Sequence, residues 1–139
     1  ITISSGLESV VPIFSCKQLN PKIKESSANV FEVKSGGNFT YRCDLSIDIK
    51  SCKDKPAGYI GCSNPEFKFD FPNETKKIDN RIIERIETNH QEDYIAYHFW
   101  VNISSVGKIH EGEYRWKMIR LMEQEILTQS MFRINVLSN

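Results

Sequence analysis

The sequence predicts an all-β domain in which two sheets pack face to face. Two observations favour this class. Apolar and polar residues alternate over short stretches such as 39–47 and 99–103, which is typical of strands with one buried face. Turn residues, mainly glycine, proline and asparagine, separate these stretches. About eight or nine short strands arranged in this way fit a two-sheet sandwich.

The size and charge of the chain narrow its class further. Its 139 residues suit one domain with a full core, so we treat 1–139 as a single domain whose first 29 residues hold the first strand. Its 18 basic and 18 acidic residues give a net charge of zero, which argues against a nucleic-acid partner. Apolar runs are only a few residues long, so we expect membrane attachment only through a segment outside this chain.

The first half of the chain supplies the first predicted strands. The apolar patch at 10–14 contains Pro12, which limits it to an edge strand. Residues 29–33 predict a short strand, and a Ser-Gly-Gly turn follows at 35–37. Residues 39–47 then alternate cleanly and predict a strand with one buried face.

The second half continues the pattern after a polar, lysine-rich loop. Residues 59–62 predict a short strand, and three phenylalanines alternate with charges over 67–71. Residues 82–86 fit either a strand or a short helical turn, and we favour a strand because the segment lies between two β segments. The last predicted strands cover 94–104, 113–121 and 129–137.

The stretch 99–116, FWVNISSVGKIHEGEYRW, resembles the E strand, E–F corner and F strand of the immunoglobulin superfamily. Tyr114 follows Val106 by eight residues, which is the spacing of that family. The family cysteine two residues after the tyrosine is replaced by Trp116, and the aspartate four before it by His110. The resemblance implies a buried Tyr114 at the corner and an inward Trp116 beside Cys43.

The resemblance extends to strand B, where Phe39 and Tyr41 precede Cys43 by four and two residues. Strand C departs from it, because no tryptophan follows and Tyr59 is the nearest bulky substitute. The long interval between Cys43 and Trp116 leaves room for an extra hairpin, so the resemblance implies a V-set-like immunoglobulin domain.

Cysteines and glycosylation sequons indicate an extracellular compartment. Four cysteines are present, an even number that permits two disulfides. Three N-x-Ser/Thr sequons, at Asn38, Asn73 and Asn102, are candidate glycosylation sites. Together they favour a secreted protein or a cell-surface ectodomain over a cytosolic protein with free thiols.

The disulfide connectivity stays open at this stage, because four cysteines allow three pairings. Cys52 and Cys62 flank one loop and can close it, which leaves Cys16 to pair with Cys43. We slightly prefer this arrangement. Its main rival joins Cys43 to Cys62.

No motif for catalysis or cofactor binding is present. The sequence lacks a nucleophile elbow, a zinc-protease motif and a phosphate-binding glycine loop, so we expect no enzyme, no cofactor and no small-molecule substrate. The cysteines lack zinc-site spacing and the histidines His90, His98 and His110 are scattered, so we expect no metal site.

The predicted F strand offers a candidate partner-binding surface. Arg115, Lys117, Met118 and Arg120 mix apolar and basic side chains on a strand through which V-type domains often pair. The competing interpretation is ordinary core packing for the apolar residues and solvation for the basic ones.

We therefore expect the extracellular recognition domain of a cell-surface receptor, which binds a protein. An immunoglobulin-like domain without the B–F cysteine pair and the strand-C tryptophan is also similar to the polymorphic allorecognition receptors of colonial hydroids. That resemblance implies homophilic binding to the same protein on an opposing cell. The alternative is an immune modulator, secreted by a parasite or virus, that binds a soluble host protein.

Overall fold

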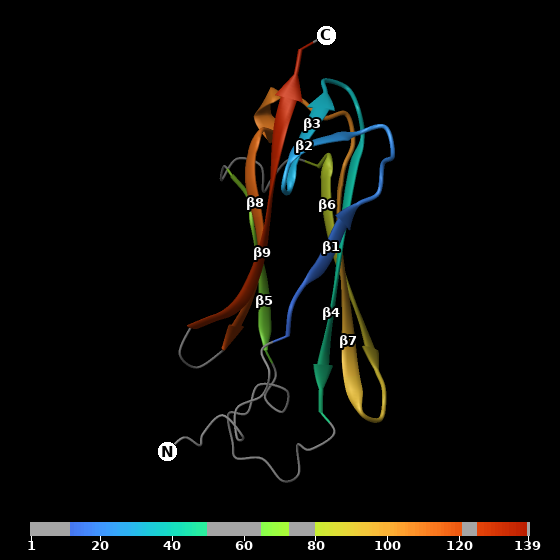
Figure 1. Cartoon of the computed structure of the whole chain (residues 1–139), viewed down its shortest axis with the longest axis vertical. Helices are drawn as coiled ribbons and strands as arrows, with labels where there is room; N and C mark the ends of the chain where they lie inside the picture. Colours follow the sequence, from blue (N-terminus) through green and yellow to red (C-terminus); the bar gives the residue numbers. More distant parts are fainter. Residues whose placement is uncertain (1–11, 50–64, 73–79, 121–124, 139) are drawn as a thin grey trace.

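Two β-sheets lie face to face in the computed structural model, which describes residues 12–49, 65–72, 80–120 and 125–138 (Figure 1). Every strand pair of the first sheet is antiparallel. In sheet order, its strands are β1 (Ser15–Gln18), β4 (Phe39–Asp48), β7 (Tyr94–Ile103) and β6 (Ile82–His90).

The second sheet contains one parallel pair among antiparallel ones. In sheet order, its strands are β2 (Lys24–Ser27), β3 (Val30–Lys34), β9 (Glu125–Leu137), β8 (Gly112–Arg120) and β5 (Glu66–Asp70). The parallel pair joins β3 to β9. A short 3₁₀ helix, η5 (Lys108–His110), connects β7 in the first sheet to β8 in the second.

These sheets have the arrangement of an immunoglobulin-like sandwich. The first sheet corresponds to strands A, B, E and D, and β5, β8 and β9 correspond to C, F and G. The N-terminal part of the chain crosses between the sheets, with β1 on the first and β2 and β3 on the second (Figure 1). The predicted all-β, two-sheet β-sandwich is therefore confirmed.

The core forms between the two sheets from alternate residues of the long strands. On β4 every second side chain from Phe39 to Ile47 is buried, and its partners on β7 are inward-facing as well. Removing these large apolar side chains from water is the main stabilising contribution to such a fold. The inward residues of β8 and β9 complete the core, namely Tyr114, Trp116, Met118, Phe132, Ile134 and Val136.

Most predicted strands lie where the sequence placed them, and the first one does not. Within residues 12–14, which cover the described part of the 10–14 patch, no strand forms, and β1 begins at Ser15. Pro12 has no N–H for a ladder, whereas the following residues pair with β4. Phe14 still packs edge-on against Phe99, with ring centroids 5.4 Å apart.

The segment at 82–86 is a strand, as favoured, and extends to His90 as β6. Its backbone pairs with β7 along its whole length, and this pairing overrides its helix-forming composition.

The strand in the C position is β5, because it pairs with β8. Phe69 lies opposite Trp116 in this pair, and their ring centroids are 4.5 Å apart. Phe69 therefore supplies the inward aromatic ring for which Tyr59 was the predicted substitute. Tyr59 itself and the predicted strand 59–62 lie outside the described residues.

Candidate functional site

The corner between β7 and β8 is a structural frame built around Tyr114. The Tyr114 ring is fully buried, and its hydroxyl donates a 2.6 Å hydrogen bond to the backbone oxygen of His110. His110 is also fully buried, and its Nδ1 accepts a 2.9 Å hydrogen bond from the N–H of Gly107. This is the tyrosine-corner geometry of immunoglobulin-like domains, with His110 integrated into it.

Trp116 lies in the core, only 2% exposed. Its ring centroid is 4.9 Å from that of Phe99, which is the cross-strand neighbour of Cys43. Cys43 is fully buried in the same cluster. The indole N–H of Trp116 has no hydrogen-bond partner among the described residues, so the ring is held by packing.

A disulfide joins Cys16 to Cys43, and it links β1 to β4 within the first sheet. The two residues are direct cross-strand partners, with Cα atoms 4.0 Å apart. The rival pairing of Cys43 with Cys62 is therefore wrong. Cys52 and Cys62 lie outside the described residues.

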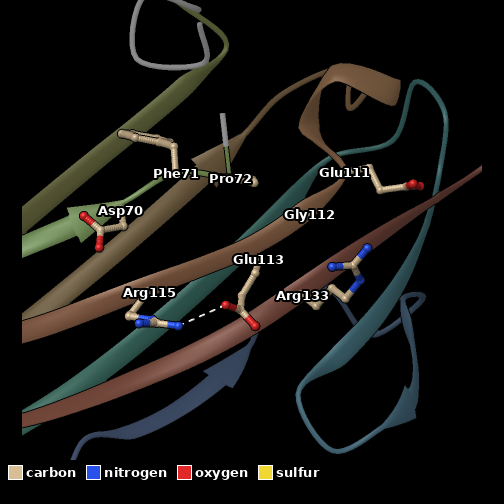
Figure 2. A pocket seen from close by; sticks show the side chains of 8 residues that line it. All are labelled: Asp70, Phe71, Pro72, Glu111, Gly112, Glu113, Arg115 and Arg133. Carbon is tan, nitrogen blue, oxygen red and sulfur yellow. Dashed lines mark hydrogen bonds and ion pairs between the residues drawn. The ribbon is translucent and has the colours of Figure 1, made fainter. Parts of the chain in front are cut away.

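The outward side chains of β5, β8 and β9 form a charged surface that we call the groove face (Figure 2). A shallow groove runs along it where β5 ends and β8 begins. Gly112 lines it, and a side chain at this position would collide with the ring of Pro72. The groove is lined by Asp70, Phe71, Pro72, Glu111, Gly112, Glu113, Arg115 and Arg133.

Charged side chains of both signs pair across the groove face. The Arg115 guanidinium donates to the Glu113 carboxylate at 3.0 Å (Figure 2). It also donates to the Met131 sulfur at 3.1 Å. The Lys117 ammonium lies 2.7 Å from the carboxylate of Asp70 on the neighbouring strand. These pairs hold the charged ends of the side chains in fixed positions over the sheet.

Arg133 differs from the other cations of the groove face. Its Nε donates a 3.0 Å hydrogen bond to Asn135, and within the described part of the chain it forms no ion pair. The side chain is exposed, and so is Met131 beside it on β9. Arginine in such a position offers its remaining N–H groups to a carboxylate brought by a partner.

Glu111 at the rim of the groove has a structural function. Its Oε1 accepts a 2.9 Å hydrogen bond from the backbone N–H of Val136 and lies 3.1 Å from the Lys108 ammonium. The Val136 hydrogen bond, followed by the Lys108 one, lowers the pKa of Glu111 below its ordinary value. Glu111 therefore links the corner between β7 and β8 to β9 through its hydrogen bond with Val136.

The structure separates the four residues that were predicted to contact a partner. Arg115 and Lys117 point outward on the groove face. Met118 is fully buried, so its prediction as a contact residue is wrong. The side chain of Arg120 lies outside the described part. Asp70, Met131 and Arg133 were not predicted as site residues, because they become neighbours of Arg115 and Lys117 only through strand pairing.

Two of the three sequons can be placed, both at the same end of the first sheet. Asn38 precedes β4, and its Oδ1 accepts a 3.2 Å hydrogen bond from the N–H of Ser105. Asn102 lies on β7 opposite Thr40, whose hydroxyl donates to its Oδ1 at 2.8 Å. Asn73 lies outside the described residues.

The outer surface of the first sheet, which we call the tryptophan face, centres on Trp100. The guanidinium carbon of Arg42 on β4 lies 5.0 Å from the indole centroid, and that of Arg85 on β6 lies 4.2 Å from it. Both distances are within the range of cation–π attraction. This cluster could not be predicted from the sequence, because its members meet only through the β4–β7–β6 register.

Asp44 lies beside this cluster and has two partners. The Asp44 carboxylate is 2.6 Å from Nδ1 of His98 and 3.1 Å from Nε of Arg42. Burial opposes ionisation of Asp44, but hydrogen bonds from His98 and Arg42 outweigh it and lower its pKa. His98 thus has an acidic partner on this face.

The described residues contain no group of three histidine, cysteine or acidic side chains placed to hold a metal ion. No helix within the described ranges is long and apolar enough to cross a membrane.

Comparisons with known proteins add little to these observations. No family model matches the chain, and the search of curated proteins finds no relative. Among solved structures, the chain is similar to one titled "Twitchin kinase region from C.elegans (Fn31-NL-kin-CRD-Ig26)", with a TM-score of 0.39 and 15% sequence identity. The match covers 76% of this chain and 14% of that one, so this chain spans a small part of that protein's length. The fold assignment therefore rests on strand pairing and burial.

Proposed function

We propose that this chain is an extracellular recognition domain of a cell-surface receptor, and that it binds the same protein on an opposing cell through the groove face. One observation carries the proposal: this face presents both signs of charge together with the exposed Arg133 and Met131. Arginine, methionine and aromatic residues are enriched where proteins bind one another.

The mixture of charges favours a partner identical to the domain itself. In a two-fold symmetric contact, the same patch lies on both subunits, so it must be complementary to itself. A surface of one sign would repel its own copy. The groove face instead carries the carboxylates of Asp70 and Glu113 beside the cations of Arg115 and Arg133. A second copy turned through 180° can therefore place acids opposite bases.

The extracellular part of the proposal has separate support. The Cys16–Cys43 disulfide is the kind of bond that persists in oxidising compartments. The described part of the chain presents two sequons on its surface, at Asn38 and Asn102.

Cell aggregation tests the proposal. The whole chain is tethered to the membrane of cells that do not aggregate by themselves, and clumping is measured. We expect clumping with the native chain, and its loss with Arg133→Glu and with Met131→Asp, because both side chains are exposed on the groove face. The secreted chain alone should self-associate with a dissociation constant of roughly micromolar or weaker, and many copies on two membranes raise the avidity.

Lys17→Glu is the matched control. Lys17 is exposed on β1 in the other sheet, and the substitution makes the same change of charge as Arg133→Glu. Cells carrying it should clump as the native cells do. If native cells never clump and a soluble host protein binds the chain tightly, the alternative of a secreted immune modulator replaces homophilic recognition.

A further inference from the structure

Two apolar side chains lie on the tryptophan face on two sides of Asn102, the exposed Ile83 and the half-buried Trp100. Ile83 lies directly opposite Asn102 on β6 and is 60% exposed. Trp100 precedes Asn102 by two residues on β7, so their side chains point to the same side of the sheet. Ile83 and Trp100 together give this part of the sheet surface an apolar character beside the Asn102 carboxamide.

The carboxamide of Asn102 is oriented by its neighbour. The Thr40 hydroxyl donates a 2.8 Å hydrogen bond to Oδ1 of Asn102. Across the described ranges, Nδ2 of Asn102 makes no hydrogen bond. Nδ2 is the atom to which an N-linked sugar is attached, and Asn102-Ile103-Ser104 is an acceptor sequence. The contact with Thr40 thus engages Oδ1 and leaves Nδ2 without a hydrogen-bond partner among the described residues.

The surroundings of Trp100 suit a sugar ring. Arg42 and Arg85 bring guanidinium groups to within 5.0 Å and 4.2 Å of the indole centroid, from the strands on either side. Guanidinium N–H groups donate hydrogen bonds to neutral oxygens as well as to anions. Pyranose rings have an apolar face of C–H groups and a polar rim of oxygens. An indole and an isoleucine beside two arginines match both parts.

We infer that Asn102 carries an N-linked glycan whose first sugar packs over Ile83 and Trp100, with Arg42 and Arg85 as donors to its oxygens. The inference rests on the proposed extracellular function, because the sugar is transferred in the secretory pathway. The donor is a lipid pyrophosphate-linked oligosaccharide. A bond forms between Nδ2 and the anomeric carbon, the bond from that carbon to the pyrophosphate oxygen breaks, and Nδ2 loses one proton.

This glycan would close the tryptophan face to protein partners. A sugar standing over the centre of β7 blocks close packing of another sheet on β4, β7 and β6. Recognition is then confined to the opposite sheet, where the groove face lies. The exposed Ile83 side chain is thereby explained, because the first sugar of the Asn102 glycan covers it.

The test uses the whole chain secreted from a eukaryotic host, with and without Ser104→Ala. This substitution destroys the acceptor sequence but leaves Asn102, Trp100 and Ile83 in place, and Ser104 is exposed. Mass spectrometry of tryptic peptides gives the occupancy of each sequon. Because the chain has two tryptophans and Trp116 is buried, iodide quenching of fluorescence reports on Trp100.

We expect Asn102 to be occupied in the native chain. Ser104→Ala should then raise iodide quenching and lower the midpoint of thermal unfolding by about 3 °C, as small stability changes do in domains of this size. In an Ile83→Ser background, Ser104→Ala should shift the unfolding midpoint much less, because the sugar has already lost one of its two apolar contacts. Ile83 is exposed, so its substitution leaves the fold intact.

Two results would overturn the inference. The first is an empty Asn102 in a chain whose Asn38 or Asn73 is occupied, which leaves the extracellular proposal standing. The second is an occupied Asn102 whose removal changes neither quenching nor the unfolding midpoint, which means that the sugar does not pack on the sheet. If all three sequons are empty, both this inference and the extracellular proposal fail, whereas the aggregation assay still tests homophilic binding by itself.

Discussion

Tyr114 is bound to His110 four residues upstream, through a 2.6 Å hydrogen bond between its hydroxyl and a backbone oxygen. Because the Tyr114 ring is fully buried, no water can replace this partner if the hydroxyl is removed. The bond therefore fixes the path of the chain as it passes from the first sheet to the second.

Tyr114→Phe should lower the free energy of unfolding by about 1–3 kcal/mol, because a buried carbonyl oxygen loses its hydrogen bond. Urea unfolding followed by circular dichroism measures the loss. Tyr97→Phe is the matched control, since the Tyr97 hydroxyl makes no hydrogen bond within the described residues and its loss should cost little. Equal effects from the two substitutions would contradict the structural role of the corner.

Trp116→Ala should cost on the order of 3–5 kcal/mol, because a large ring is removed from a packed core. The ring touches Phe69 and Phe99 on the two facing sheets, with centroids 4.5 Å and 4.9 Å away. Trp116→Phe is the milder comparison, because it keeps an aromatic ring and removes an N–H that has no partner in the described structure. A loss below about 1 kcal/mol on Trp116→Ala would place the ring on the surface.

Gly112→Ala should destabilise the domain more than Gly36→Ala. Both glycines have positive φ angles, +136° and +90°, so an alanine at either position is strained by about 1–3 kcal/mol. Only at Gly112 would the new methyl group also collide with Pro72, because nothing lies within 4 Å of the position at Gly36. Thermal unfolding of the two variants separates collision from backbone strain. Similar midpoints would show that Pro72 moves away freely.

Asp44 should make stability depend on pH in the acid range. Its pKa is lowered in the folded state, so its stabilising contribution is present above the ordinary pKa of an aspartate and is lost as the pH falls through the lower pKa of the folded state. Since the side chain is 42% exposed, we expect the contribution to stay below about 1 kcal/mol. Asp44→Asn should therefore be less stable than the native chain at pH 6 and equally stable near pH 2, in urea titrations at each pH.

Glu66→Gln is the control for this pH dependence. Its side chain makes no ion pair or hydrogen bond within the described residues, so it should track the native chain at both pH values. If the free energy of unfolding of Asp44→Asn differs from that of the native chain by the same amount at every pH, the loss of stability comes from packing and not from charge.

The disulfide between Cys16 and Cys43 should contribute roughly 3–4 kcal/mol, because it closes a loop with a sequence separation of 27. The variant with Cys16→Ala and Cys43→Ala measures this by urea unfolding, and Cys52→Ser with Cys62→Ser serves as the comparison. Two disulfides are expected in all, so thiol titration of the denatured, unreduced chain should find no free thiol. Two or more reactive thiols would count against an extracellular compartment.

The strands were predictable from the sequence where the alternation of apolar residues was long. Residues 39–47 and 94–104 carry one apolar face over about ten residues, and the structure places strands there. Residues 82–86 were ambiguous because their composition favours a helix as well. The first strand was misplaced because β1 is short and half-exposed, so its alternation is weak.

The candidate site was harder to predict, because it depends on contacts between distant residues. Arg133 lies opposite Glu113 only because β9 pairs with β8 in this register. Asp70 lies opposite Arg115 for the same reason, through the pairing of β5 with β8. Met118 could have been assigned to the core, since it is two residues from Trp116 on the same strand. The register then shifts between Met118 and Ile119, so both are buried in succession, and simple alternation misses this.

The crossing of the N-terminal segment between the two sheets has a mechanical consequence. The Cys16–Cys43 bond attaches the chain to β4 before β2 and β3 join the other sheet. A force that pulls on the chain ahead of Cys16 is therefore transmitted through sulfur into the ten-residue β4, and it bypasses the weaker hydrogen bonds of β2 and β3. Under tension, the domain should yield by separating β4 from β7 and not by peeling from its N-terminal end, for as long as that bond is oxidised.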